Sequence, residues 1–317
     1  MDIFNPLGEK KSQEMESSQL ASRYLSAAVS DNTRLAYRND IAHFVGMGFE
    51  LPASPDQLQQ YLLLCADKYN PRTLSRRLIA IGQWHQTQKL NDPTKDPNVA
   101  KTMNGIARLH GVPKKQAPAI SMNDLKAMVR CLDEGADSRS IRDKAILLIG
   151  FFGAFRRSEL AALTWDKVEF ASDGLIIQIP RSKTDQKVEG GDCIIPLGKE
   201  PNCAVRALID WRATSKQYTG PVFRKLSQTG TLGMAAMNAE SINLVVRKRA
   251  QQAKLINWQK MSSHSLRRGF ATEAARKGAS MPAIQRHGRW RSVKTVVEYI
   301  EAGRQFADSA ANVLIED

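Results

Sequence analysis

The hydrophobic pattern of this chain is helical over most of its length. Apolar residues recur at intervals of three and four, which is the spacing of one helix face. One such face follows Pro55 and consists of Leu58, Tyr61, Leu62 and Cys65. β-rich runs occur only near residues 174–180 and 193–196, on either side of a polar loop, and helices are expected again from Ala204 to the end. The pattern predicts a mainly α fold with one small antiparallel sheet.

A short basic segment with glycine and proline, residues 111–119, divides the pattern into two parts. We expect a polar, flexible N-terminus over residues 1–19 and a helical bundle over residues 20–110. Residues 120–317 then form a mixed domain in which helices surround the small sheet. A chain of 317 residues is long enough for two domains with separate cores.

Several helix starts can be placed from capping residues. Asn32 or Thr33 is expected to cap a first helix, and Pro71 to open a later one. Ser121 and Asp124 have the spacing of a capping box. Buried helices are expected near 141–153 and 157–164. The buried face of the first helix is expected to hold Tyr37, Ile41, Phe44 and Val45.

The charge indicates a polyanionic partner. The net charge is +14, with 15 Lys and Arg against 11 Asp and Glu in residues 1–118 and 31 against 21 in the remainder. No apolar run is long enough to span a membrane, and no signal peptide is apparent. The four cysteines have neither metal-site nor disulfide spacing. We therefore expect a cytoplasmic protein, associated with the nucleoid when bound to DNA, and no membrane partner.

If the polyanion is DNA and the chain cuts it, a metal-dependent route would need clustered ligands. The carboxylates of Asp166, Glu169, Asp173 and Asp185 are scattered around the expected strands. We therefore expect no metal. A metal-free enzyme must instead supply cations for the phosphate oxygens, an acid for the leaving oxygen and a nucleophile.

Two basic motifs could supply the cations. Arg156 follows an apolar run and precedes Glu159 by three residues, so it is either an oriented phosphate clamp or an ordinary helix ion pair. His264 and Arg267 share a helix face. They could relay a proton and bind phosphate, or simply form a capping or salt-bridged pair.

Three further residues have both a chemical and a structural interpretation. Lys183 lies in the polar loop between the β runs, either solvated or delivered into a cleft as an acid. Tyr299 is either a core aromatic or a nucleophile. Trp290, nine residues earlier, is either core packing or part of the same site.

The order of these residues resembles the tyrosine site-specific recombinases of the phage integrase family, and most of all its Cre-like members. FRRSELAALTW resembles the first arginine box, HSLRRGFATEAARKG the HxxR box and HGRWRSVKTVVEYI the nucleophile box. TRLAY and PRTLSRRLIAI are similar to the two DNA-facing helices of the N-terminal domain. The resemblance implies a SAM-like core-binding domain before an α+β catalytic domain.

The resemblance also implies a mechanism. Tyr299 would attack the scissile phosphate, leaving a 3′-phosphotyrosine and a free 5′-hydroxyl, and two rounds would pass through a Holliday junction. The catalytic set would then be Arg156, Lys183, His264, Arg267, Trp290 and Tyr299, with Glu159 orienting Arg156 or the histidine. Trp290 stands where most members have histidine, and an indole cannot exchange protons. No cofactor is implied.

The implied partner is double-stranded DNA with inverted-repeat core sites, bound by a homotetramer that joins two sites. The need for an accessory protein or a second recombinase is left open. The segment from Phe306 to Ile315 could dock on a neighbouring protomer or pack as a terminal helix of its own chain. Expected DNA-binding residues are Arg34, Arg72, Thr73, Arg76, Arg247 and Lys248, the last two beside Arg249 on a helix near residues 240–253.

Three other functions fit part of the pattern. A binding protein on an inactive recombinase fold would be expected to lack a catalytic residue, but every expected position is filled. A type IB topoisomerase or a telomere resolvase shares the chemistry, and a topoisomerase would relax a plasmid alone. A phage integrase with an arm-binding domain needs more than the roughly 20 residues that precede the first core helix.

Overall fold

The computed structural model describes residues 30–113, 116–135, 137–180 and 191–315. The chain forms two compact units, and the described residues of the second begin at Gln116. The N-terminal segment expected to be flexible lies outside the described residues. The mainly helical fold class is confirmed. Among the described residues, no helix is long and apolar enough to cross a membrane.

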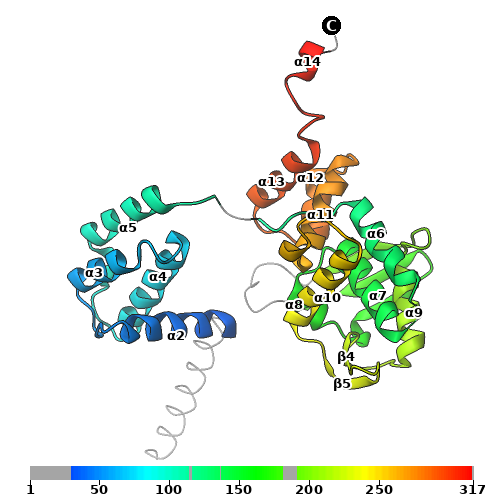
Figure 1. The fold of residues 1–317 in the computed structure, drawn as a ribbon, viewed down its shortest axis with the longest axis horizontal. Coiled ribbons are helices and arrows are strands. Elements are labelled where there is room, and N and C mark those ends of the chain that lie inside the picture. Colours follow the sequence, from blue (N-terminus) through cyan, green and yellow to red (C-terminus); the bar gives the residue numbers. More distant parts are fainter. Residues whose placement is uncertain (1–29, 114–115, 136, 181–190, 316–317) are drawn as a thin grey trace, which may run out of the picture. The chain divides into compact units, whose positions relative to one another are not determined.

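The first unit is a small helical bundle, drawn in blue and cyan in Figure 1. Its core is lined by aromatic and aliphatic side chains that include Phe44, Tyr61 and Leu74, each fully buried. The bundle consists of α2 (Asp31–Gly46), α3 (Pro55–Cys65), α4 (Pro71–Thr87), a 3-10 turn η1 (Pro93–Lys95) and α5 (Pro97–His110).

Local capping explains where most of these helices begin. Ser54 and Gln57 form a reciprocal capping box in front of α3, with Pro55 in its first turn. In the second unit, Ser121 and Asp124 form the expected capping box. These starts are therefore determined by a few neighbouring residues.

The first helix differs from its prediction in where it starts and in which residues its buried face holds. Its cap is Ser30, whose hydroxyl accepts from the Thr33 backbone N–H at 3.2 Å, so the helix begins at Asp31 and not after Asn32 or Thr33. Val45 is 50% exposed although Phe44 is fully buried. One helical residue turns the side chain by about 100°, which takes Val45 off the buried face.

The second unit is larger, and α7 lies in its core. Ten residues of α7 are buried, and the helix packs against α6, α9 and α11. The helices of the unit are α6 (Met122–Asp133), α7 (Ser138–Phe152), α8 (Arg157–Ala161), α9 (Ala204–Ser215), α10 (Ala239–Gln252), α11 (Ser263–Arg276), α12 (Met281–Gly288), α13 (Val293–Arg304) and α14 (Asn312–Ile315), with 3-10 turns η2 (Trp165–Lys167) and η3 (Trp258–Lys260).

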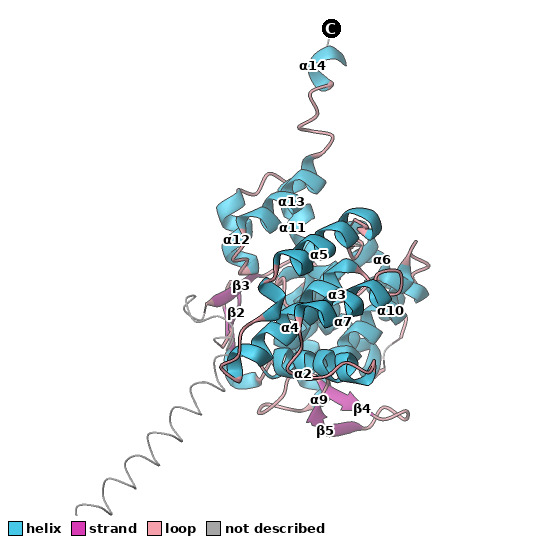
Figure 2. Cartoon of the chain, turned by 90° about the vertical axis from the view of Figure 1, so that its left-hand side faces the viewer, coloured by secondary structure: helices cyan, strands magenta, loops and turns pink. Residues whose placement is uncertain are grey.

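Two separate antiparallel sheets accompany these helices (Figure 2). One has the order β1 (Val168–Ala171), β2 (Gly174–Gln178) and β3 (Asp192–Pro196). The other pairs β4 (Arg224–Leu226) with β5 (Leu232–Ala236). The expectation of helices alone after residue 204 was wrong. Leu232, Gly233 and Ala236 of β5 are partly covered and Met234 and Ala235 are exposed, so this strand lacks a clear period-two apolar pattern.

Candidate active site

Arg156 lies at the turn between α7 and α8. The left-handed φ of 46° at Ala154 turns the chain, and Phe155, 1% exposed, anchors the turn in the core. Arg156 then takes the N-cap position of α8. Its backbone N–H donates to Glu159 Oε2 at 2.9 Å, and its guanidinium donates to Glu159 Oε1 at 2.5 Å. Its side chain is 43% exposed, so this cation can meet a ligand from solvent.

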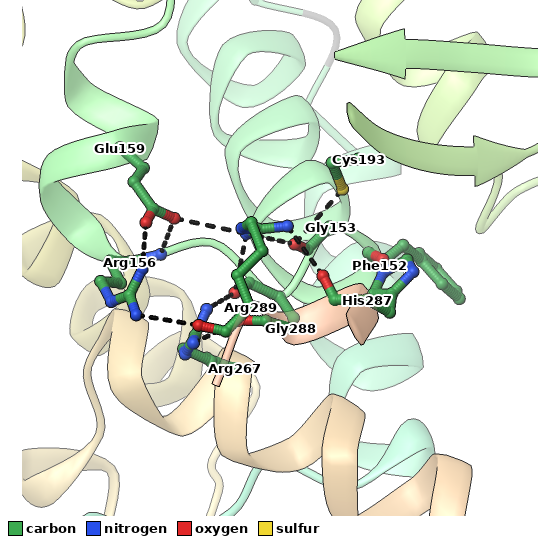
Figure 3. Close-up of polar contacts among 10 residues, drawn as sticks. Phe152, Gly153, Arg156, Glu159, Cys193, Arg267, His287, Gly288 and Arg289 are labelled. Atoms are coloured by element: carbon green, nitrogen blue, oxygen red, sulfur yellow. Dashed lines mark hydrogen bonds and ion pairs between the residues drawn. The ribbon is translucent and has the colours of Figure 1, made fainter. Parts of the chain in front are cut away.

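Arg267 is a buried cation in the same cluster (Figure 3). It projects from α11, is 3% exposed, and donates to the carbonyls of Ala154 and Gly288. Its guanidinium carbon lies 4.3 Å from the ring centroid of Trp290. Burial, and then the positive charge of Arg156, lower the pKa of Arg267 to about 9. Arg267 therefore stays charged at neutral pH.

Tyr299, on α13, packs against Trp290. Their ring centroids are 5.5 Å apart at 62°, and Tyr299 is 4% exposed. Gly288 makes room for the indole, because a Cβ there would lie 1.7 Å from the Trp290 ring. Burial raises the pKa of Tyr299 above its ordinary value of 10.0, although Arg267 and Arg268 oppose the shift. The phenol is therefore protonated at neutral pH, and chemistry through it needs a proton acceptor.

Glu159 is shared by two arginines, one of which the sequence analysis did not assign. Besides Arg156, it is approached by Arg289, whose Nη2 lies 3.3 Å from Glu159 Oε2. Burial works to raise the pKa of Glu159, but Arg289 and Arg156 outweigh it and lower the pKa. The sequence does not distinguish Arg289 from its basic neighbours Arg286 and Arg291, because the backbone conformation decides where the Arg289 side chain points.

His287 also belongs to this cluster and was not assigned a role. Its Nε2 donates to the Phe152 carbonyl at 2.7 Å, and its ring stacks on Phe270 at 4.5 Å. Burial lowers the pKa of His287. The imidazole of His287 is therefore neutral at neutral pH and packs between the Phe152 carbonyl and the Phe270 ring.

The structure brings most of the predicted catalytic residues together. His264 is exposed in the first turn of α11, three residues before Arg267. Lys183 lies outside the described residues. The side chains that meet in one cluster are those of Arg156, Glu159, Arg267, Trp290 and Tyr299.

The expected DNA-binding residues of the first unit lie on α2 and α4. Arg72 is exposed and Thr73 is half-buried on α4. Arg76 is half-exposed and donates to Asp40 of α2 at 2.8 Å, so one of its donors is already used. Arg34, on α2, takes part in an ion pair within its own helix.

The three consecutive basic residues of α10, residues 247–249, differ in their exposure to solvent. Lys248 is exposed, and Arg247 is half-buried and donates to the Met261 carbonyl at 3.2 Å. Arg249 is 5% exposed and is bound to Asp143 of α7. Arg249, which was not among the expected DNA-binding residues, therefore faces the core, because one helical residue turns its side chain away from that of Lys248.

Within the described ranges, no group of three or more His, Cys, Asp or Glu is placed to hold a metal ion. The carboxylate nearest to the clustered arginines, Glu159, is already bound by Arg156 and Arg289.

The fold matches solved structures of DNA recombinases. XerH, in a post-cleavage complex with a palindromic difH substrate, aligns with a TM-score of 0.62 at 18% identity, covering 83% of this chain and 73% of that one. The Tn1549 transposon integrase, in complex with circular intermediate DNA, aligns with a TM-score of 0.64 at 16% identity, covering 96% and 99%. These likenesses show that the chain has the fold of these DNA recombinases, and in this fold a tyrosine packs beside clustered arginines.

Sequence comparisons define the family. The model of the phage integrase family matches residues 119–305. An integrase/recombinase xerD homolog of Selenomonas ruminantium is 36% identical, covering 92% of this chain and 88% of that protein. The recombinase cre of Escherichia phage P1 is 28% identical, covering 78% and 76%. The chain therefore belongs to the phage integrase family of tyrosine site-specific recombinases, enzymes that cut and rejoin DNA strands.

Proposed function

We propose that Tyr299 is the nucleophile of this recombinase and that Arg156 and Arg267 bind the scissile phosphate. The observation that carries the proposal is the packing of Tyr299 and Trp290 beside the buried guanidinium of Arg267. Two guanidinium groups held close together can stabilise the negative charge that develops on the non-bridging oxygens in the transition state of phosphoryl transfer.

Cleavage follows as one displacement at phosphorus. The Oη–P bond to Tyr299 forms while the bond from phosphorus to the 5′-oxygen breaks, and a 3′-phosphotyrosine remains. His264, exposed at the start of α11, accepts or relays the phenol proton. Lys183 donates a proton to the departing 5′-oxygen. The 5′-hydroxyl of a partner strand then reverses the step, so the bond energy is retained.

The supporting residues have separate tasks. Glu159 orients Arg156 through two contacts, one to its backbone N–H and one to its guanidinium. Trp290 packs on Arg267 and Tyr299 without exchanging protons. Because Tyr299 is 4% exposed, its ring or α13 must shift before Oη can reach a phosphate.

The two units divide the work of holding DNA. Residues 20–110 bind the core site through α2 and α4, residues 111–119 link the units, and residues 120–317 carry the catalysis. Inverted-repeat core sites place two protomers on each duplex, and four protomers join two sites. The segment from Phe306 to Ile315 docks on a neighbouring protomer; Phe306, Leu314 and Ile315 are 83%, 80% and 76% exposed.

The test is covalent capture of DNA. A supercoiled plasmid carrying the DNA that flanks this gene is incubated with the protein in EDTA, and the reaction is stopped with SDS. The wild type should form a protein–DNA adduct, and Tyr299→Phe should bind the same DNA without forming one. Tyr218→Phe, at an exposed tyrosine, is the matched control and should form the adduct.

Each outcome has a distinct meaning. An adduct formed by Tyr299→Phe would remove the nucleophile assignment. Specific binding by the wild type without an adduct would indicate an inactive binding protein or a missing partner protein. Mapping the cut in the wild type would identify the core site.

A further inference from the structure

Arg289 has a backbone conformation that is unusual for its residue type. It follows α12 with a φ of 56°, in the left-handed region that arginine rarely adopts. Such a conformation persists only where surrounding contacts hold it. Its side chain is 11% exposed, unlike the exposed Arg286 and Arg291 on either side. The backbone therefore turns this one arginine inward.

The guanidinium of Arg289 joins three segments of the catalytic unit. Nη1 donates to the His287 carbonyl at 2.8 Å, and Nη2 donates to the Gly153 carbonyl at 3.0 Å. Nη2 also lies 3.3 Å from Glu159 Oε2. Figure 3 shows Arg289 between Glu159 and Gly153. The end of α12 is thus tied to the turn after α7 and to α8.

The backbone of the same turn holds both proposed phosphate-binding arginines. The Arg289 carbonyl accepts from Arg156 Nη2 at 3.1 Å. The carbonyl before it, that of Gly288, accepts from Arg267. The residue after it, Trp290, packs on the guanidinium of Arg267. A shift of this turn would therefore move both arginines.

Charge gives Arg289 a second effect. Glu159 alone would neutralise Arg156, the most exposed of the three clustered arginines, by pairing with it. With Arg289 on the same carboxylate, the cluster of Arg156, Arg267, Arg289 and Glu159 carries three positive charges and one negative charge. The cluster therefore keeps a net positive charge, and Arg156 can attract a phosphate although it is paired with Glu159.

We propose that Arg289 is a positioning residue for DNA cleavage. It holds the turn of residues 288–290 and shares Glu159, so that Arg156 and Arg267 meet the scissile phosphate together. This inference rests on the proposed function, because it needs both arginines to act on the phosphate.

The test compares cleavage with binding in Arg289→Gly. Glycine accepts the left-handed backbone without strain, so the variant removes the guanidinium while keeping the turn accessible. We expect the single-turnover rate of adduct formation at saturating DNA to fall by about 10- to 100-fold. DNA affinity should match that of Arg286→Ala, a neighbouring variant with the same loss of charge. Arg289→Asn, which also tolerates this backbone, should repeat the result.

Two further variants separate positioning from simple loss of structure. Arg289→Lys keeps the charge and should recover part of the rate. Arg289 acts in part through Arg156. Arg289→Gly should therefore slow adduct formation by a smaller factor in an Arg156→Ala background than it does in the wild type. Thermal melting of each variant identifies any loss of fold.

The inference is overturned if Arg289→Gly and Arg289→Asn cleave as fast as Arg286→Ala, or if the losses with Arg156→Ala are additive. The proposed function fails in a different way, through an adduct that persists in Tyr299→Phe. The two failures are therefore distinguishable.

Discussion

Burial shifts the pKa of Arg267 and that of His287 in the same direction, but the outcomes differ. Arg267 starts so high that a pKa of about 9 still leaves it charged at neutral pH. His287 starts at 6.5, and burial lowers its pKa, with Arg289 and Arg267 adding to the effect against the Phe152 carbonyl. The cluster around Tyr299 therefore combines charged guanidinium groups with a neutral imidazole.

Acid should destabilise the second unit through His287. The unfolded chain binds a proton near the ordinary histidine pKa of about 6.5, and the folded chain binds it only at lower pH. Below that pH the unfolded state holds more protons, so the free energy of unfolding falls as pH falls.

His287→Gln keeps a side-chain donor for the Phe152 carbonyl but does not titrate. Between about pH 7.5 and pH 5.5 it should lose less stability than the wild type. Urea denaturation at both pH values, followed by tryptophan fluorescence, measures the difference. Equal losses in the two proteins would contradict the role of His287.

At the scale of elements, α7 and α10 are joined by a buried ionic contact. Asp143 of α7 accepts from Arg142 at 2.8 Å and from Arg249 of α10 at 2.6 Å. The arginine side chains are each 6% exposed and that of Asp143 is 2% exposed. Both buried arginines contact the Asp143 carboxylate, so removing it takes away an ion-pair partner that the two cations share.

Asp143→Ala should lower the free energy of unfolding of the second unit by about 3–5 kcal/mol. The control is Asp133→Ala, whose partner Lys144 follows Asp143 directly; Asp133 is 36% exposed, and this variant should cost under about 1 kcal/mol. Guanidinium denaturation in a Trp84→Phe background makes the remaining tryptophans report on the second unit. Similar costs for the two variants would argue against a buried ionic tie.

At the scale of the whole molecule, the net charge of +14 is shared by both units. Lys and Arg exceed Asp and Glu on each side of the linker, so both units are attracted to a duplex. The proposed nucleophile Tyr299 and the proposed phosphate-binding residues Arg156 and Arg267, by contrast, meet in the second unit. Affinity and catalysis should therefore respond to different substitutions.

DNA affinity should fall steeply with salt, because each neutralised phosphate releases counterions. Arg72→Ala, on the exposed face of α4, should reduce the slope of log affinity against log salt by about 0.9 if Arg72 binds a phosphate. A lost base contact would instead relax sequence preference at one position and leave the slope nearly unchanged. Titrations from about 50 to 300 mM salt measure the slope. An affinity independent of salt would contradict a phosphate-dominated interface.

Local signals were enough for much of the fold. Pro55 and Pro71 begin helices, and Ser121 with Asp124 forms the expected cap, because these effects depend on residues within one helical turn. The ordered catalytic boxes indicated the family in the same way. The order of motifs along the chain needed no knowledge of how the helices pack.

Contacts between distant segments settled what the sequence left open. Arg289 turns inward because of a left-handed backbone, and its partners Gly153 and Glu159 lie more than a hundred residues away along the chain. Arg249 of α10 can be buried because Asp143 of α7 pairs with it. The sequence by itself determined the family and predicted a set of catalytic residues. Only the tertiary structure decided which cations are buried, shared or exposed, because desolvation and charge pairing depend on neighbours that folding brings together.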